Sequence, residues 1–216
     1  MDQAGIRAVR MERFDQDLLQ FDDPSGLHLE IVANDEDNRI PWTTAEINED
    51  VAIRGIFAVT LSIAEVQSTY AFLLNEFGFT KVEQEGKYTR FVSNEGPAAG
   101  NYVDIRNDQG QARGHNGIGT VHHVAWRVES DEALLAMRHR LANELGFRVT
   151  DVKDRNYFHS IYFRMPGHVL FEIATVPPGF AIDESLEELG QALKLPEWEE
   201  VNRSEIEKGL PVLLSD

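Results

Sequence analysis

One stretch decides the fold: Thr120-Val121-His122-His123-Val124-Ala125-Trp126-Arg127-Val128, whose β-branched and apolar residues predict a strand. A helix is expected over Asp131 to Leu145, because apolar residues recur every three to four positions and Gly146 stands where a helix-ending glycine belongs. Three further strands are expected, at Phe147 to Val152, His159 to Arg164 and Val169 to Ala174. This order of elements predicts a βαβββ unit.

The same order occurs once more, earlier in the chain. The expected elements are a strand, a helix and three strands, at Ile53 to Thr60, Ala64 to Phe77, Phe79 to Gln84, Tyr88 to Ser93 and Tyr102 to Arg106. Phe77-Gly78-Phe79 matches Leu145-Gly146-Phe147, and Asp104 matches Glu172 at the same offset. The sequence therefore contains an internal repeat, and we predict an α+β fold in which repeated βαβββ modules form curved mixed sheets.

The repeat divides the chain into five parts. Residues 1–34 form a partial module of three strands, at Ile6 to Phe14, Asp17 to Phe21 and Leu27 to Ala33. Residues 35–50 are a polar linker, 51–110 a module without candidate metal ligands, and 111–176 a module with them. Residues 177–216 are a helical tail, with helices expected at about Glu184 to Leu195 and Ser204 to Lys208. The first part has no leading strand or helix, so we expect the chain to start inside a module.

Composition limits the possible partners. The formal net charge of −17 repels phosphate backbones and anionic lipid, so we expect neither nucleic acid nor a membrane as a partner. No apolar run approaches the ~20 residues of a membrane span, and the first residues have no signal-peptide core, so we expect a cytoplasmic protein. Because there is no cysteine, a metal ion would be held by His, Asp or Glu.

The first and last strands of the last module carry candidate ligands. Side chains alternate along a strand, so His122 and His123 are expected to face opposite sides. Glu172 stands between Phe171 and Ile173, where a carboxylate is costly unless it is paired or bound to a metal. Two histidines and one carboxylate form the facial triad of non-haem Fe(II) oxygenases. Taken singly, a strand histidine is more often a partnered polar residue, and a strand glutamate more often faces water.

The preceding module does not repeat this ligand pair. His123 is matched there by about Ala58, and Glu172 by Asp104. Without the histidine, that module cannot form the same site.

Several motifs together resemble a known family. They are Phe21 to Val32, Gly119 to Trp126, Asp154 to Phe158, Phe171 to Thr175, and Pro178 to Phe180 with Asp183-Glu184. This combination resembles the ring-cleaving dioxygenases of the vicinal oxygen chelate superfamily, in particular the hydroquinone-type, MhqO-like branch. The resemblance covers nearly the whole chain.

The resemblance implies a cofactor, a reaction and a set of site residues. The cofactor would be Fe(II), with Mn(II) or another divalent metal as the alternative, and the substrates a hydroquinone or catechol-like ring and O2. His123 and Glu172 match two metal ligands, and His122 a histidine beside them. Arg155 matches an arginine that steadies charge on a substrate oxygen, and Tyr162 a tyrosine near the ligands.

The residues alone leave other roles open for two of these side chains. Arg155 is also compatible with a surface ion pair to Asp151 or Asp154, and Tyr162 with a place in the core.

The chain departs from the family at one ligand. The family's remaining ligand is a histidine on the opening strand of a first module, which this sequence does not contain. Three outcomes follow: an inactive chain that only binds small molecules, completion by a separate N-terminal polypeptide, or a homodimer. In the homodimer, two copies of His123 and Glu172 would hold one metal, as in a glyoxalase-like isomerase or lyase.

Overall fold

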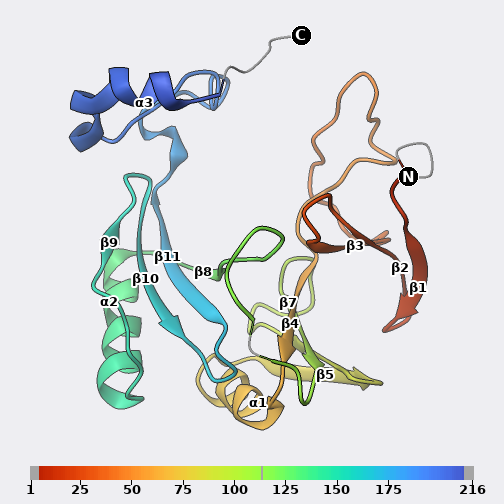
Figure 1. Cartoon of the computed structure of the whole chain (residues 1–216). Coiled ribbons are helices and arrows are strands. Elements are labelled where there is room, and N and C mark those ends of the chain that lie inside the picture. The colour runs from red at the N-terminus through yellow and green to blue at the C-terminus, as the bar shows by residue number, and fades with distance from the viewer. Residues whose placement is uncertain (1–4, 113, 212–216) are drawn as a thin grey trace. The chain divides into compact units, whose positions relative to one another are not determined.

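The computed structural model describes residues 5–112 and 114–211 (Figure 1). The chain forms two compact units. Unit 1 comprises Met1–Val124 and Arg164–Phe171, and unit 2 comprises Ala125–Phe163 and Glu172–Asp216. Unit 1 therefore combines the residues of the partial module with those of the module expected at 51–110. Among the described residues, no helix has the length and apolar character needed to cross a bilayer.

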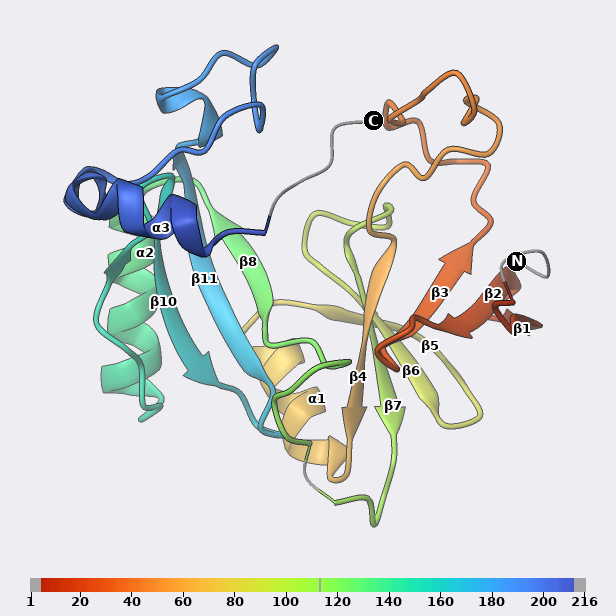
Figure 2. The ribbon, with the colours of Figure 1, turned by 45° about the horizontal axis from the view of Figure 1, so that its top comes forward.

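Unit 1 contains two sheets. The first is antiparallel, in the order β1-β2-β3, with bounds Val9–Arg13, Gln16–Asp22 and His28–Val32. The second has the order β4-β7-β6-β5, with bounds Ala58–Ile63, Tyr102–Asn107, Tyr88–Val92 and Thr80–Glu85. β4 and β7 run parallel and lie side by side in Figure 2, whereas the other pairs are antiparallel. The second sheet is therefore mixed, as predicted.

Helix α1, Val66–Asn75, connects β4 to β5. Glu65 caps its first turn by accepting from the backbone N–H of Gln67 at 3.0 Å. Its buried side chains recur at helical spacing: Val66, Thr69, Phe72 and Leu73. The helix ends as expected, since Gly78 has φ +69° and the Phe79 N–H bonds the Leu73 carbonyl at 2.9 Å.

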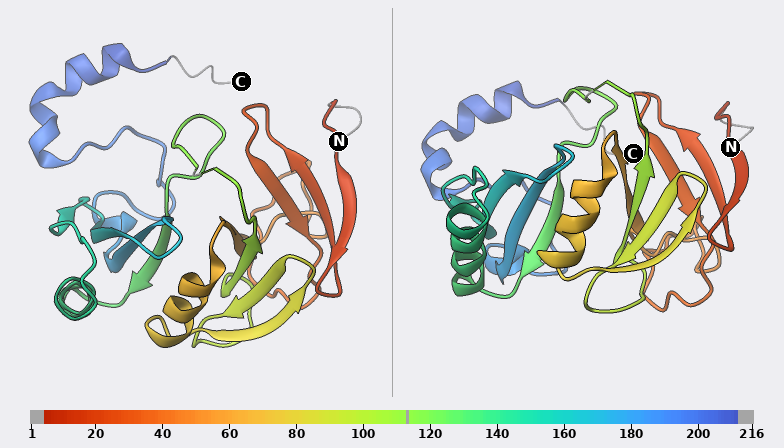
Figure 3. Two further views of the ribbon diagram at one scale, coloured as in Figure 1. Left: turned by 60° about the horizontal axis from the view of Figure 1, so that its bottom comes forward. Right: turned by 90° about the horizontal axis from the view of Figure 1, so that it is seen from below.

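Unit 2 holds most of a second four-stranded sheet, in the order β8-β11-β10-β9. The strand bounds are Val124–Val128, Leu170–Pro178, Phe158–Arg164 and Lys153–Asp154. Helix α2, Asp131–His139, continues as a π-helical turn, Arg140–Glu144, and lies beside this sheet in Figure 3. The tail contains 3-10 helices at Phe180–Ile182 and Glu197–Asn202, and helix α3 at Arg203–Gly209.

Three predicted elements differ from the structure, two of them at glycines. The strand expected from Ile53 starts only at Ala58, because Gly55 has φ +136°. The tail helix expected at 184–195 is a series of turns, with Gly190 at φ +79° in its middle. The strand expected at Phe147 to Val152 is reduced to one bridge, between Val149 and Phe163.

Candidate functional site

Glu172 is the third residue of β11 and is buried, with 3% of its surface exposed. Its neighbours Phe171 and Ile173 are also buried. The hydroxyl of Tyr162, on the adjacent strand β10, donates a hydrogen bond to Oε1 of Glu172 at 2.5 Å. This bond offsets part of the cost of burying a carboxylate and fixes the orientation of its oxygens.

Arg155 lies in the turn that precedes β10. Its Nη2 donates to the hydroxyl of Tyr162 at 3.5 Å, and its guanidinium lies 5.7 Å from the centroid of the Tyr162 ring. Unit 2 thus contains a hydrogen-bonded series from an exposed cation, through a phenol, to a buried carboxylate. Such a series can hold a negatively charged ligand atom at its outer, cationic end.

The alternative ion-pair partners of Arg155 have other contacts. Asp151 accepts from Nη2 of Arg138 at 2.7 Å, and Asp154 accepts from the backbone N–H of Asn156 at 2.8 Å. Tyr162 is half-buried, with its hydroxyl engaged by Glu172.

The tail of unit 2 is attached to the turn that carries Arg155. Tyr157 donates its hydroxyl to Oδ2 of Asp183 at 3.0 Å and stacks on Phe180 with ring centroids 5.0 Å apart. The backbone N–H of Gly179 donates to the carbonyl of Tyr157 at 2.9 Å. Burial raises the pKa of Tyr157, and the bond to Asp183 raises it further. These contacts connect the turn at Tyr157 to the tail.

His122 and His123 precede β8 and do not lie within it, so the alternation predicted for them is wrong. They follow a turn in which Gly119 has φ +77° and the Thr120 hydroxyl donates to the Gly117 carbonyl at 2.7 Å. The Nδ1 atoms of the two histidines are 2.8 Å apart, with the rings at 88°. His122 is exposed and His123 is half-buried.

The two predicted metal ligands belong to different units, His123 to unit 1 and Glu172 to unit 2. Within residues 5–112 and 114–211, no three His, Asp or Glu side chains are grouped as a metal site. The residues that the structure groups within one unit are Arg155, Tyr162 and Glu172.

Sequence reasoning did not identify Arg90 and Glu30. Arg90 forms a doubly hydrogen-bonded ion pair with Asp104, at 2.8 Å for both bonds. Glu30 is bound by Arg13 and is the third residue of β3, as Asp104 is the third of β7. The signal was present in the sequence, because Leu29-Glu30-Ile31 has the same apolar, acidic, isoleucine pattern as Phe171-Glu172-Ile173.

Comparisons with known proteins agree on one group of relatives. No family model matches the chain. Two Bacillus subtilis (strain 168) proteins named as ring-cleaving dioxygenases, MhqO and MhqE, are 43% and 38% identical to it over 210 and 213 residues. These matches cover 97% and 99% of this chain, and 66% and 69% of the relatives.

A third relative carries a substrate in its name. It is a chlorohydroquinone/hydroquinone 1,2-dioxygenase of Sphingobium indicum, 35% identical over 189 residues, which cover 85% of this chain and 58% of the relative. Among solved structures, a protein of Bacillus subtilis subsp. subtilis str. 168 named as a dioxygenase matches with a TM-score of 0.90 and 42% identity. That match covers 99% of this chain and 67% of the other. The chain thus spans roughly two thirds of the length of these relatives.

Proposed function

The chain belongs to the MhqO-like ring-cleaving dioxygenases of the vicinal oxygen chelate superfamily, and from this premise we propose that it takes part in metal-dependent cleavage of hydroquinone or catechol-like rings by O2. The observation that carries the proposal is the buried Glu172 carboxylate, which accepts a hydrogen bond from Tyr162 behind Arg155. The name of the Sphingobium relative supports a hydroquinone as the ring.

We propose that His123 and Glu172 hold the metal. An imidazole and a carboxylate are donors that suit Fe(II), and also Mn(II). The hydrogen bond from Tyr162 supports this role, because metal-ligating carboxylates are themselves usually hydrogen-bonded and thereby oriented. Fe(II) is our choice within the divalent metals because the proposed reaction consumes dioxygen.

The other residues act on the substrate. When bound, a divalent metal lowers the pKa of a substrate phenol and brings the ring together with O2. Arg155, at the outer end of the series, stabilises the negative charge of the deprotonated substrate oxygen. Tyr162 and His122 have the chemistry to accept and return the phenol proton.

A facial triad needs one ligand more than this pair supplies. We propose that a second copy of this chain or another polypeptide segment supplies it. Metal stoichiometry separates the two sources. A homodimer with a shared site holds one metal per two chains, whereas a chain completed by another segment holds one metal per chain.

Oxygen uptake tests the proposal. The chain is loaded with Fe(II) under anaerobic conditions, its metal content is measured, and hydroquinone or catechol is added with O2. We expect uptake that is lost in His123→Ala and Glu172→Gln and kept in His139→Ala, an exposed histidine paired with Glu144. Iron-loaded protein that consumes no O2 with either ring, alone or with an added N-terminal chain, would contradict the proposal.

A further inference from the structure

A carboxylate occupies the third position of the last strand in each of the three repeats. The residues are Glu30 in β3, Asp104 in β7 and Glu172 in β11. Each lies between an apolar residue and an isoleucine. All three repeats therefore have an acidic residue at this position, and the side chains that contact these three residues can be compared.

The residue that contacts this carboxylate from the preceding strand differs among the repeats. Gln20 faces Glu30 in the register and donates to its Oε1 at 3.3 Å. Arg90 faces Asp104 and binds both of its oxygens. Tyr162 binds Glu172 through its hydroxyl. The position thus carries an amide, a guanidinium and a phenol, of which only the guanidinium is charged.

Asp104 and Arg90 form a buried pair, with 1% and 5% of their surfaces exposed. Nη1 of Arg90 donates to Oε1 of Gln16 at 2.6 Å, so the guanidinium also joins the two sheets of unit 1. The planar cation lies 4.3 Å from the ring centroid of Phe14 and 5.0 Å from that of Tyr102. Aromatic faces stabilise a desolvated cation, so the pocket around Arg90 is suited to a positive charge.

The residue before the opening strand completes the comparison. Phe57 directly precedes β4, as His123 directly precedes β8. The guanidinium of Arg90 lies 5.5 Å from the centroid of the Phe57 ring. By these strand starts Phe57, and not Ala58 as expected, corresponds to His123, so an aromatic ring that can only stack stands at the position of a proposed metal ligand.

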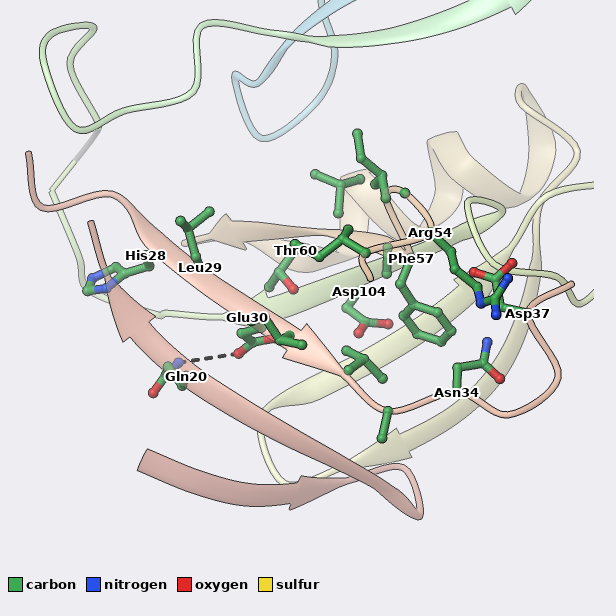
Figure 4. Close-up of a pocket in the computed structure, with 18 of the residues that line it drawn as sticks. Gln20, His28, Leu29, Glu30, Asn34, Asp37, Arg54, Phe57, Thr60 and Asp104 are labelled. Atoms are coloured by element: carbon green, nitrogen blue, oxygen red, sulfur yellow. Dashed lines mark hydrogen bonds between the residues drawn. The ribbon is translucent and has the colours of Figure 1, made fainter. Parts of the chain in front are cut away.

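Phe57, Arg90 and Asp104 border one cavity of unit 1, which has a volume of about 1370 Å³. Figure 4 shows Phe57 beside Asp104 on its wall, with Glu30 directed into the same space. Glu30 is itself bound by Arg13, which is buried with 6% of its surface exposed. Glu30 and Asp104 therefore each have an arginine partner.

We propose that the Arg90 guanidinium is an internal cation that takes the place of a metal ion in the module of residues 51–110. The comparison with the last module rests on the proposed metal role of Glu172. A buried carboxylate requires a counter-charge, and a fixed guanidinium and a divalent ion cannot both occupy that place because they repel each other. Whether the carboxylate of a module already has a guanidinium partner then determines whether that module can bind metal.

The first test moves the arginine into unit 2. Tyr162→Arg places a guanidinium beside Glu172, whereas Tyr162→Gln retains an uncharged donor like Gln20. We expect Mn²⁺ affinity, measured by isothermal titration, to fall at least about tenfold more in Tyr162→Arg than in Tyr162→Gln. Equal affinities in the two variants would overturn the role of charge.

The second test removes the arginine from unit 1, in a Glu172→Gln background that silences the other metal site. Arg90→Gln leaves the Asp104 carboxylate without its cation, so we expect the Tm to fall by roughly 10 °C. Millimolar Mn²⁺ is expected to raise that Tm by roughly 3 °C or more, because the ion replaces the guanidinium. The double variant Arg90→Gln/Asp104→Asn has no carboxylate to neutralise, so it should recover most of the loss and not respond to Mn²⁺.

Arg90→Lys is the matched control and the safeguard against misfolding. It keeps a positive charge beside Asp104, so it should fold without Mn²⁺ and show no Mn²⁺-dependent rise in Tm. If Arg90→Gln responds to Mn²⁺ no more than Arg90→Lys does, Arg90 is a packing residue and the inference is wrong. Wild-type protein that binds no metal would contradict only the proposed function, because the unit 1 variants are compared without Glu172.

Discussion

The hydroxyl of Tyr162 lies 2.5 Å from Oε1 of Glu172, across two neighbouring strands of the unit 2 sheet. Tyr162→Phe keeps the ring but removes the hydroxyl, and with it this bond and the bond from Arg155. We expect metal affinity to fall by about 10–100-fold, because groups that orient a metal ligand contribute on this scale. Competition titration with Mn²⁺ measures the change.

Tyr70→Phe is the control for that variant, since its hydroxyl bonds Thr89 at 2.8 Å within unit 1. It should leave metal affinity unchanged. If both variants lose affinity equally, the loss comes from general destabilisation and Tyr162 does not orient Glu172.

Arg155 contacts the hydroxyl of Tyr162 and is exposed, so its proposed partner is the substrate. Arg155→Ala is expected to lower kcat/KM for hydroquinone by about 100-fold, the scale of one lost charge-stabilising donor. Metal content should not change. Arg155→Lys should recover only part of the activity, because an ammonium lacks the planar fork of a guanidinium.

The control is Arg148→Ala, since Arg148 is an exposed arginine of the same unit. A parallel loss of metal in Arg155→Ala would place Arg155 in metal binding.

Tyr157 attaches the tail to the turn that carries Arg155, and burial together with Asp183 raises its pKa above 10.0. A raised pKa in the folded state means that the stabilisation is complete below pH 10 and is lost as pH rises through the folded value. Ultraviolet titration at alkaline pH should show one tyrosine that ionises late. That step should be absent in Tyr157→Phe and occur at lower pH in Asp183→Asn. An unchanged titration in Asp183→Asn would show that the contact does not form.

Local patterns in the sequence were sufficient for most strands. The strands expected from Tyr88 and Tyr102 start at those residues, because aromatic and β-branched residues, which favour strands, are frequent there. His122 and His123 were expected within a strand, but they lie before it. They follow a turn with a bond from Thr120 to Gly117, which composition does not reveal.

Arg155, Tyr162 and Glu172 were each named as candidates from the sequence, but the contacts among them were not predicted. Tyr162 and Glu172 meet because two strands pair in one register, and Arg90 meets Asp104 for the same reason. Which strands pair, and in which register, also depends on turn geometry, which the residue pattern did not show. The repeat indicated which positions correspond, while the partner of each carboxylate required the structure.

Asp108 is buried in unit 1 and holds three side chains together. It accepts hydrogen bonds from Ser62 and Arg106 at 2.5 Å and from Lys87 at 3.1 Å. Burial alone would raise its pKa, but these bonds outweigh burial and lower the pKa below 3.8. The stabilisation is therefore present above pH 3.8 and is lost as pH falls through the lower, folded value.

Asp108→Asn should lower the free energy of unfolding at pH 7 by about 2–3 kcal/mol, the range for hydrogen bonds to a charged group. The difference from wild type should shrink in urea titrations repeated toward pH 2. Asp17→Asn, which breaks the exposed pair with Arg10, should have a smaller effect at every pH. A difference that stays constant with pH would show that the carboxylate charge is not the cause.

Gly167 lies in the turn between β10 and β11 and allows that turn to pack on α1. Its φ is +91°, and an added Cβ would lie 2.7 Å from Oγ1 of Thr69 and 2.9 Å from Cδ1 of Ile63. The Thr69 hydroxyl also donates to the Pro166 carbonyl at 2.8 Å, so the turn has little room to move away. Gly167→Ala should therefore combine backbone strain with a steric clash and cost about 2–4 kcal/mol of unfolding free energy.

Gly110→Ala separates the two effects, because Gly110 has a similar φ of +85° and nothing within 4 Å of the added Cβ. Urea denaturation of both variants should show the larger loss in Gly167→Ala, and equal losses would mean that the contact with α1 contributes nothing.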